Sequence, residues 1–291
     1  MNPALGALLA GATFIALSPI FVRASLADGV GPTAAAFWRV ALAVPVLWIV
    51  FGLTHRPRVQ RDYGIGPLLF AAALAFAGDL VFWHKSIQLT SVANATLLAN
   101  LASIFVTLAA WIFLRQRPTR TFLAGLAASL AGVALLVHAS LGFSTTGLVG
   151  DALGVVTAMF YAGYLLAVKG LRDRGESALY LMAVATTITA VLLFPVALAT
   201  GEQMTPQSAA GWWILVGLAL ISHAAGQGLI AYALAHLPAA FSSVSLLFQP
   251  VMAALFAWLL LAEPLVPLQI AGGGVVLVGI YLARRGSSTG Q

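Results

Sequence analysis

Residues 234–282 read LAHLPAAFSSVSLLFQPVMAALFAWLLLAEPLVPLQIAGGGVVLVGIYL, and residues 87–135 read IQLTSVANATLLANLASIFVTLAAWIFLRQRPTRTFLAGLAASLAGVAL. The two stretches align at a constant offset of 147 positions, which is the separation of Ile87 from Leu234. The aligned landmarks are Trp111 with Trp258, Gly125 with Gly272, Gly132 with Gly279, and the turn at Gln116 with the turn at Glu263. Each stretch holds two apolar runs joined by a short turn, so a pair of helices is present twice. Such self-similarity indicates an internal repeat.

The composition around this repeat is that of a membrane protein. Of the 291 residues, 61% are hydrophobic and only 8% are charged, and the mean hydropathy is +1.00. A soluble domain carries about 25% charged residues, so this chain cannot cover a surface that faces water. Apolar runs long enough to cross a hydrocarbon core of about 30 Å recur from end to end. They predict an all-α integral membrane protein with ten spans, at 3–23, 33–53, 65–88, 92–114, 119–138, 147–168, 178–199, 210–233, 239–261 and 266–283.

The basic residues predict the orientation of these spans. Eleven of the 14 lie in alternate loops or at the end of the chain, on one side of the membrane. They are Arg56, Arg58, Arg61, Arg115, Arg117, Arg120, Lys169, Arg172, Arg174, Arg284 and Arg285. The positive-inside rule makes that side cytoplasmic, so both termini are expected inside the cell, with the chain in the inner (plasma) membrane. The net charge of +6 therefore reflects membrane topology, and no nucleic-acid partner is expected.

Residues 1–143 and 144–286 would each hold five spans, followed by a short polar tail at 287–291. Because five is odd, the two halves would insert in opposite directions. Two inverted repeats with a substrate held between them near the midplane are a recurring transporter architecture. A channel or a membrane enzyme can also be built from repeats, so the repeat favours transport without excluding them.

The second half resembles a known family. The features that carry the resemblance are the Ala233-Leu234 pair, Pro250, Glu263 in a short turn, and a glycine-rich last span that contains Gly272, Gly273, Gly274 and Gly279. They are similar to the EamA repeat of the drug/metabolite transporter superfamily, once in each half and more weakly in the first. There, Ser103 aligns with Pro250 and Gln116 with Glu263, so these positions are interpreted as structural, a helix kink and a turn. Further bends are expected at Pro19, Pro45 and Pro195.

The resemblance implies a ten-helix carrier of small organic solutes, often an exporter of amino acids. Overall similarity is greatest to bacterial exporters of aromatic and neutral amino acids, the YddG type. The family likeness also implies a central cavity lined by the first, third, fourth, sixth, eighth and ninth spans. The expected partners are a small neutral or aromatic amino acid and membrane lipid, and no oligomer is required.

Polar side chains at helical spacing are the candidates for that lining. In the fourth span Thr96, Asn100, Ser103 and Thr107 share one face, with Asn94 near its outer mouth, and in the ninth Ser242, Ser245 and Gln249 do. Small polar residues also bond between membrane helices, so packing is an equally open interpretation. The two stripes do not coincide at the offset of 147, which argues against a symmetric binding site.

Two further pairs come from the second half. Tyr161 and Tyr164 share a face of the sixth span, and His223 and Gln227 share one of the eighth. Tyrosines would suit a ligand with a ring or alkyl side chain, or they could anchor the span at the membrane interface. His223 could contact a ligand or could pack as a neutral, hydrogen-bonded side chain.

The stretch FAGDLVFWHK (residues 76–85) places charge inside an apolar span. Asp79 is expected about 15 Å below the outer surface and shares a face with Trp83, while Lys85 can reach that surface. Arg39 in the second span lies at nearly the same depth. Two interpretations remain open: a structural ion pair between Asp79 and Arg39, or a cavity position at which Asp79 contacts a substrate ammonium or takes up a proton.

Other function classes find less support. The sequence has no Gly-x-Ser-x-Gly, His-Glu-x-x-His or Walker-type motif, so no catalytic residue, cofactor or nucleotide-driven motor is expected. The absence of cysteine excludes disulfides and thiolate metal sites, and the five histidines are scattered. The principal alternative is an exporter of another small solute or drug, for which Asp79 is the candidate site of proton coupling. An enzyme using Asp79 and His223, an ion channel and a scaffold are weaker alternatives. We expect facilitated export by alternating access.

Overall fold

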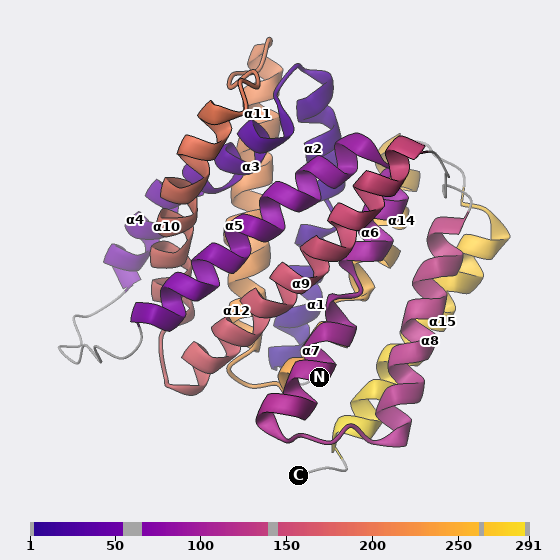
Figure 1. The fold of residues 1–291 in the computed structure, drawn as a ribbon. Coiled ribbons are helices and arrows are strands. Elements are labelled where there is room, and N and C mark those ends of the chain that lie inside the picture. The colour runs from indigo at the N-terminus through magenta and orange to yellow at the C-terminus, as the bar shows by residue number, and fades with distance from the viewer. Residues whose placement is uncertain (1–2, 55–65, 139–144, 262–264, 289–291) are drawn as a thin grey trace.

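The computed structural model describes residues 3–54, 66–138, 145–261 and 265–288, and over these ranges the chain forms helices and turns without strands (Figure 1). In chain order the elements are α1 (Pro3–Ile15), α2 (Ser18–Ala27), α3 (Pro32–Ala41), α4 (Ala43–Thr54), α5 (Gly66–Leu89), α6 (Val92–Ala99), α7 (Ala102–Leu114), α8 (Arg120–Val137), α9 (Thr145–Asp173), α10 (Ala178–Ala199), α11 (Ala209–Gly217), the π-helix η3 (Leu218–Gln227), α12 (Gly228–Ala233), α13 (Ala239–Ser245), α14 (Phe248–Leu261) and α15 (Pro267–Ser288).

These elements form the ten predicted spans. Within the described ranges, nine helical spans are long and apolar enough to cross a membrane, and Arg120–Leu136 is a shorter apolar helix. The predicted boundaries differ from the observed ones by at most five residues, most at the ends of α9 and α15. The all-helical membrane fold is therefore confirmed. The long apolar runs made the prediction accurate because a hydrophobic helix in lipid has no alternative way to pair its backbone.

Three of the four prolines inside spans mark helix breaks. Pro19 is the second residue of α2, and Pro45 and Pro250 are the third residues of α4 and α14. Proline has no N–H to donate to the carbonyl four residues earlier, and its ring collides with that carbonyl. The preceding helix therefore ends, and proline sits in the first turn of the next one, where a missing donor costs little. Pro195 instead lies within the continuous helix α10.

The fourth span breaks without a proline. Asn100 and Leu101 form the turn between α6 and α7, and Ser103 stands where the second half has Pro250. The backbone N–H and the hydroxyl of Ser103 both donate to the Asn100 carbonyl, at 3.2 and 3.0 Å, and the Asn100 amide donates to the Thr96 carbonyl at 2.7 Å. Short polar side chains thus provide local partners that compete with the helix ladder. Both halves therefore have a helix break at this position, made by proline in the second half and by short polar side chains in the first.

The eighth span contains a feature that the sequence did not predict. Leu218–Gln227 forms a π-helix between α11 and α12, with His223 and Gln227 in it. Neither proline nor a polar cluster marks this segment, so hydropathy gives no signal for it. π-helical segments are frequently found at functional sites, because they turn side chains away from the regular helical register.

Helices α8 and α15 form a tightly packed antiparallel pair at one side of the molecule (Figure 1). A methyl group added at Gly125 would lie 2.6 Å from the Gly279 carbonyl oxygen, and one at Gly132 would lie 2.7 Å from that of Gly272. Contacts this short leave room only for glycine, as in other small-residue interfaces between membrane helices. Gly125 and Gly272 are counterparts in the repeat, and so are Gly132 and Gly279. Gly125 therefore contacts the counterpart of Gly132, and Gly132 contacts the counterpart of Gly125.

The centre of this pair relates the two halves. The hydroxyl of Ser129 lies 3.5 Å from the carbonyl oxygen of Val276, and these two residues are separated by 147 positions. A residue can meet its own repeat counterpart only where the pseudo-two-fold axis passes. Trp111 and Trp258, another aligned pair, expose similar fractions of their surface, 50% and 48%. The repeat seen in the sequence is therefore present in the packing.

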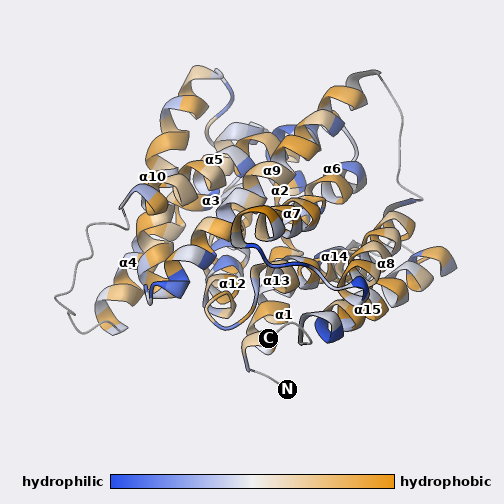
Figure 2. Ribbon diagram, turned by 60° about the horizontal axis from the view of Figure 1, so that its bottom comes forward, coloured by the Kyte–Doolittle hydropathy of each residue, from blue (hydrophilic) through white to orange (hydrophobic). Residues whose placement is uncertain are grey.

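The two ends of the molecule differ in charge. We call the end that carries both termini and the α7–α8 and α9–α10 turns the basic face (lower end in Figure 1), and the other end the opposite face. Arg117 and Arg174 lie in these turns. Figure 2, which brings the basic face forward, shows hydrophilic residues at the α7–α8 connection, whereas the flanks of the helices are largely hydrophobic.

On the opposite face two loops cap each other's helices. Glu202 accepts from the backbone N–H of Thr33, at 2.7 Å, in the first turn of α3, and its carboxylate lies 3.7 Å from Lys85. In return, Asp28 accepts from the N–H of Ser208, at 3.2 Å, at the start of α11. Carboxylates are stabilising at helix N-termini, where N–H groups lack partners. These contacts join the α2–α3 and α10–α11 connections into one unit.

The ninth span is packed unequally along its length. Every residue from Phe241 to Leu247, in and just after α13, is buried, and α13 packs on α7 toward the basic face. In α14 no residue from Val251 to Leu260 is fully buried. The bundle is therefore closed around α13 and looser around α14.

Candidate functional site

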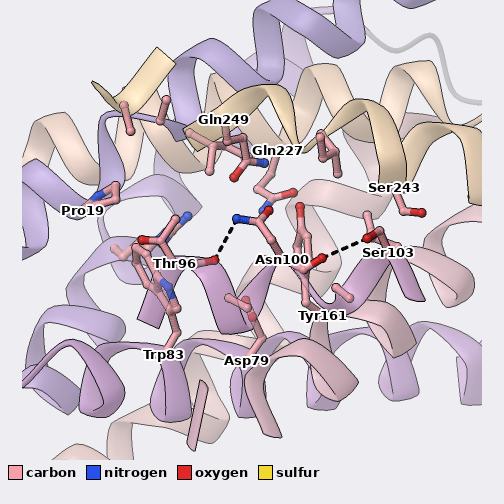
Figure 3. A pocket seen from close by; sticks show the side chains of 18 residues that line it. Pro19, Asp79, Trp83, Thr96, Asn100, Ser103, Tyr161, Gln227, Ser243 and Gln249 are labelled. Atoms are coloured by element: carbon pink, nitrogen blue, oxygen red, sulfur yellow. Dashed lines mark hydrogen bonds between the residues drawn. The ribbon is translucent and has the colours of Figure 1, made fainter. Parts of the chain in front are cut away.

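A cavity of about 80 Å³ lies in the middle of the bundle, where several broken helices meet (Figure 3). Ala16, Asn100 and Leu246 line it, and each is a residue of the turn that interrupts its span. Gln227, the last residue of the π-helix, also lines it. Many transporters expose polar groups to their substrate at interrupted helices near the midplane of the membrane. Such interruptions are tolerated there because the surrounding protein shields the polar groups from lipid.

Seven of the predicted site residues lie together in the lining. They come from α3, α5, the α6–α7 turn, α9, η3 and α14, and they are Arg39, Asp79, Trp83, Asn100, Tyr161, Gln227 and Gln249. Figure 3 shows Asp79 and Trp83 on one helix, with Asn100, Tyr161, Gln227 and Gln249 on the other side of the same space. The cavity is also lined by Thr96 and Ser103, from the polar stripe of the fourth span.

The cavity holds two opposite charges that are not paired with each other. Arg39 is 3% exposed and Asp79 is 8% exposed, yet the structure shows no ion pair within 4.0 Å between them. The guanidinium carbon of Arg39 lies 5.9 Å from the centroid of the Trp83 ring, a cation–π contact. Of the two interpretations drawn from the sequence, a direct structural ion pair is not the arrangement seen.

Lining groups from other helices also lack partners. The Nε of Arg39, the hydroxyl of Tyr161 and the Oε1 of Gln227 are buried and make no hydrogen bond of standard geometry with the described residues. The side chains of Gln227 and Gln249 nevertheless lie close to the Tyr161 hydroxyl. An unsatisfied buried polar atom costs about 1–3 kcal/mol, so most are paired in folded proteins. Their concentration around one cavity indicates a place where a polar ligand can supply what the protein does not.

Asn94 and Tyr164 lie outside the lining. The Asn94 amide donates to the Asp151 carboxylate at 3.1 Å, which joins the start of α6 to α9 near the opposite face. The Tyr164 hydroxyl donates to the sulfur of Met182 at 3.8 Å, and its ring lies 4.7 Å from that of Phe76. Both residues pack between helices, which for Asn94 is the packing alternative drawn from the sequence and for Tyr164 is neither of the two roles considered there.

His223 and Ser245 are likewise held within the packing. The Nε2 of His223 lies 2.8 Å from the Thr186 hydroxyl, and its ring stacks on Phe76 with centroids 5.2 Å apart. The hydroxyl of Ser245 donates to the Phe241 carbonyl, at 2.9 Å, one turn earlier in α13. His223 and Gln227 were expected on one face, and in the π-helix only Gln227 reaches the cavity.

The structural role predicted for Pro250 fits the break at α14, whereas Glu263 lies outside the described residues. Ser243 lines the cavity, whereas the helical spacing of polar residues predicts a face with Ser242 and Ser245. The difference arises from the turn at Leu246 and Leu247, because helical spacing predicts a shared face only along a continuous helix. Within the described ranges no group of three or more His, Cys, Asp or Glu residues could hold a metal ion.

Comparisons with known proteins match this chain along both halves. The EamA-like transporter family matches residues 2–138 and again 148–285. A protein named "Probable terminal-alkyne amino-acid exporter" from Streptantibioticus cattleyicolor is 30% identical over 267 residues, 89% of this chain and 86% of its own. The "Pseudopaline exporter CntI" of Pseudomonas aeruginosa is 26% identical over 282 residues, covering 96% and 94%.

The fold has also been seen in a solved structure. A protein of known crystal structure superposes with a TM-score of 0.80 over 98% of each chain, at 18% sequence identity. The predicted EamA resemblance is confirmed by the two family matches, and the named relatives are exporters. The chain therefore belongs to the EamA-like transporter family and is a multi-pass membrane transporter, not an enzyme.

Proposed function

We propose that this protein exports aromatic and other neutral amino acids across the inner membrane by alternating access. This is the function that the resemblance of its sequence to the YddG-type exporters implies. The observation that carries the proposal is the polar cavity at the meeting point of three helix breaks. The names of the two relatives support export as the direction, and one of them names an amino acid as the solute.

In this proposal residues 1–143 and 144–286 are the inverted repeats that rock about the α8–α15 axis. The basic face is cytoplasmic by the positive-inside rule, with both termini inside the cell. Closure around α13 and loose packing around α14 then correspond to an outward-facing state. The lining residues contact substrate, and Asn94, Tyr164, His223 and Ser245 hold the helices that carry the lining.

Transport is proposed to be facilitated, because Asp79 is the one acidic residue among the described residues of the lining and it faces a buried cation in the same cavity. Proton-coupled export of another small solute is the second candidate, since Asp79 has no direct ion-pair partner within 4.0 Å that would fix its charge.

The test is uptake of labelled phenylalanine, tryptophan, leucine, methionine and lysine into proteoliposomes, with and without an imposed pH gradient. We expect saturable uptake of the neutral amino acids without the gradient, above that of protein-free liposomes, and little uptake of lysine. Uptake only with the gradient would replace facilitated export by proton coupling. If none of the amino acids moves in either condition, the amino-acid proposal is wrong.

Sidedness is tested separately, using the natural absence of cysteine. Single cysteines replace Arg117 in the α7–α8 turn and Thr205 in the α10–α11 loop, both of which are exposed. In intact cells a membrane-impermeant maleimide should label Thr205→Cys and leave Arg117→Cys unlabelled until the membrane is opened. The reverse pattern would invert the proposed orientation and make the observed state inward-facing.

A further inference from the structure

Arg39 is the least satisfied charged group in the described part of the chain. It is 3% exposed and lines the cavity, and the structure shows no hydrogen bond or ion pair from its guanidinium to the described residues. Its guanidinium carbon lies 5.9 Å from the centroid of the Trp83 ring, and Asp79 attracts it electrostatically across the cavity without a contact within 4.0 Å. Removing a cation from water is costly unless a partner compensates. The position therefore has room for an anion in direct contact with the guanidinium, which the described residues do not supply.

Asp79 presents the complementary case. It is 8% exposed, lines the same cavity from α5, and accepts no hydrogen bond from the described residues. The nearby Lys85 does not serve as its partner, because Lys85 lies 3.7 Å from Glu202 on the opposite face. Arg39 and Asp79 are the two charged residues of the lining, and they are farther apart than 4.0 Å.

A ligand with both signs of charge on adjacent atoms would satisfy the two residues together. An α-amino acid has this form, since its carboxylate and its ammonium are attached to one carbon atom. A guanidinium binds a carboxylate through two parallel hydrogen bonds, and a carboxylate accepts from an ammonium. A simple anion or cation would satisfy one of the two charges and leave the other unpaired in a buried site.

We propose that Arg39 and Asp79 together form the head-group site for a zwitterionic α-amino acid, with Arg39 binding the carboxylate and Asp79 the ammonium. This inference rests on the proposed function and names the chemistry by which that site selects its substrate. The second span, which carries Arg39, is not among the spans that the family resemblance places in the lining. The cavity of this chain thus has a recognition element outside the expected set.

The site predicts a sharp chemical requirement. Phenylalanine should compete with labelled phenylalanine for uptake, whereas three analogues that each lack one charge should not. Phenylalanine amide and phenethylamine lack the carboxylate, and 3-phenylpropanoate lacks the ammonium. Charge-assisted hydrogen bonds contribute about 1.5–3 kcal/mol in proteins, so each loss should weaken competition about 10- to 100-fold.

Variants assign each charge to its residue. Arg39→Gln should weaken the binding of phenylalanine about 10- to 100-fold and should reduce the factor by which phenylalanine competes better than phenethylamine. Asp79→Asn should reduce the factor by which phenylalanine competes better than 3-phenylpropanoate. Ser245→Ala is the matched control, because Ser245 is buried in the same bundle outside the lining. A purely structural role would instead weaken all compounds by the same factor and leave these ratios unchanged.

The outcomes separate this inference from the proposed function. If wild-type protein transports phenylalanine and accepts the amide or 3-phenylpropanoate equally well, the head-group site is wrong and amino-acid export stands. If wild type transports no amino acid, the proposed function itself is wrong. Should the variants fail to fold, as judged by size-exclusion profile, the analogue series on wild-type protein decides alone.

Discussion

The α8–α15 pair and the central cavity use the same repeat in different ways. In the pair, repeat-related glycines meet each other's backbone, and Ser129 meets its own counterpart Val276. In the cavity the halves share lining positions that are separated by 147 residues, namely Thr96 and Ser243, Ala99 and Leu246, and Ala102 and Gln249. The side chains at these positions differ in size and polarity except for the hydroxyls of Thr96 and Ser243, so the position is kept while most of the side-chain chemistry is not. A metabolite has no two-fold axis, so a symmetric lining would present half of its polar groups to the wrong part of the ligand.

The largest effect on the contact between the two halves is expected from filling the glycine contacts. A methyl group at Gly279 would lie 2.3 Å from the Ser129 hydroxyl and 2.7 Å from the Gly125 carbonyl oxygen, so Gly279→Ala should lower the free energy of unfolding by about 1–3 kcal/mol. Gly132→Ala, its repeat counterpart, should cost the same. Thermal unfolding in detergent measures both.

The control is Gly274→Ala in the same helix, where an added methyl group would meet nothing within 4 Å. It should be neutral or stabilise by up to about 1 kcal/mol, because alanine favours the helix over glycine. Equal melting temperatures for Gly279→Ala and Gly274→Ala would contradict the close packing, and unequal losses at Gly279 and Gly132 would contradict its symmetry.

In the cavity, stability and transport should respond in opposite directions. Gln227→Met keeps the side-chain length and removes an Oε1 atom that is buried without a partner. We expect transport of phenylalanine to fall about tenfold, equivalent to roughly 1.4 kcal/mol, while the free energy of unfolding rises by about 1 kcal/mol. Uptake and thermal unfolding of one preparation test both. A fall in stability together with normal transport would show that Gln227 is a packing residue.

A smaller loss of stability than at the glycine contacts is expected where the halves share geometry without sharing sequence. Ser103→Pro places a proline at the counterpart of Pro250, in the first turn of α7, where the span is already broken. It removes the two hydrogen bonds from Ser103 to the Asn100 carbonyl but breaks no helix interior, so it should cost about 1–2 kcal/mol. Thr107→Pro, one turn farther into α7, should cost at least about 3 kcal/mol because it breaks the helix interior. Similar losses for the two variants would mean that the turn at Asn100 is not a true break.

The sequence predicted the spans far better than the shapes within them. Hydropathy locates a helix because lipid forces every backbone group to pair, and proline marks the breaks at Pro19, Pro45 and Pro250 because it removes a donor. The break at Asn100 and the π-helix at Leu218–Gln227 depend on side chains that also occur in regular helices. No local signal distinguishes them.

The prediction of the candidate site was limited by the same unmarked helix breaks. Asp79, Asn100 and Gln227 were found because polar groups in apolar spans are costly and need a purpose. The sequence left a structural ion pair between Arg39 and Asp79 open, because depth along a helix gives no information on how far apart two side chains lie. Ser243 was missed because the turn before α14 rotates the face that reaches the cavity. Errors arose where a helix was interrupted, which is also where the cavity lies.

Substrate protection of a single cysteine in the cavity tests most directly whether this space is the transport site. Ala99→Cys introduces a small thiol in the lining, and Thr205→Cys, in the exposed α10–α11 loop on the opposite face, is the control outside it. We predict that a hydrophilic thiol reagent added from the opposite face labels both variants and that saturating phenylalanine slows the labelling of Ala99→Cys at least tenfold, with no effect at Thr205→Cys. Labelling of Ala99→Cys that phenylalanine leaves unchanged would contradict the assignment of this cavity as the path of the substrate.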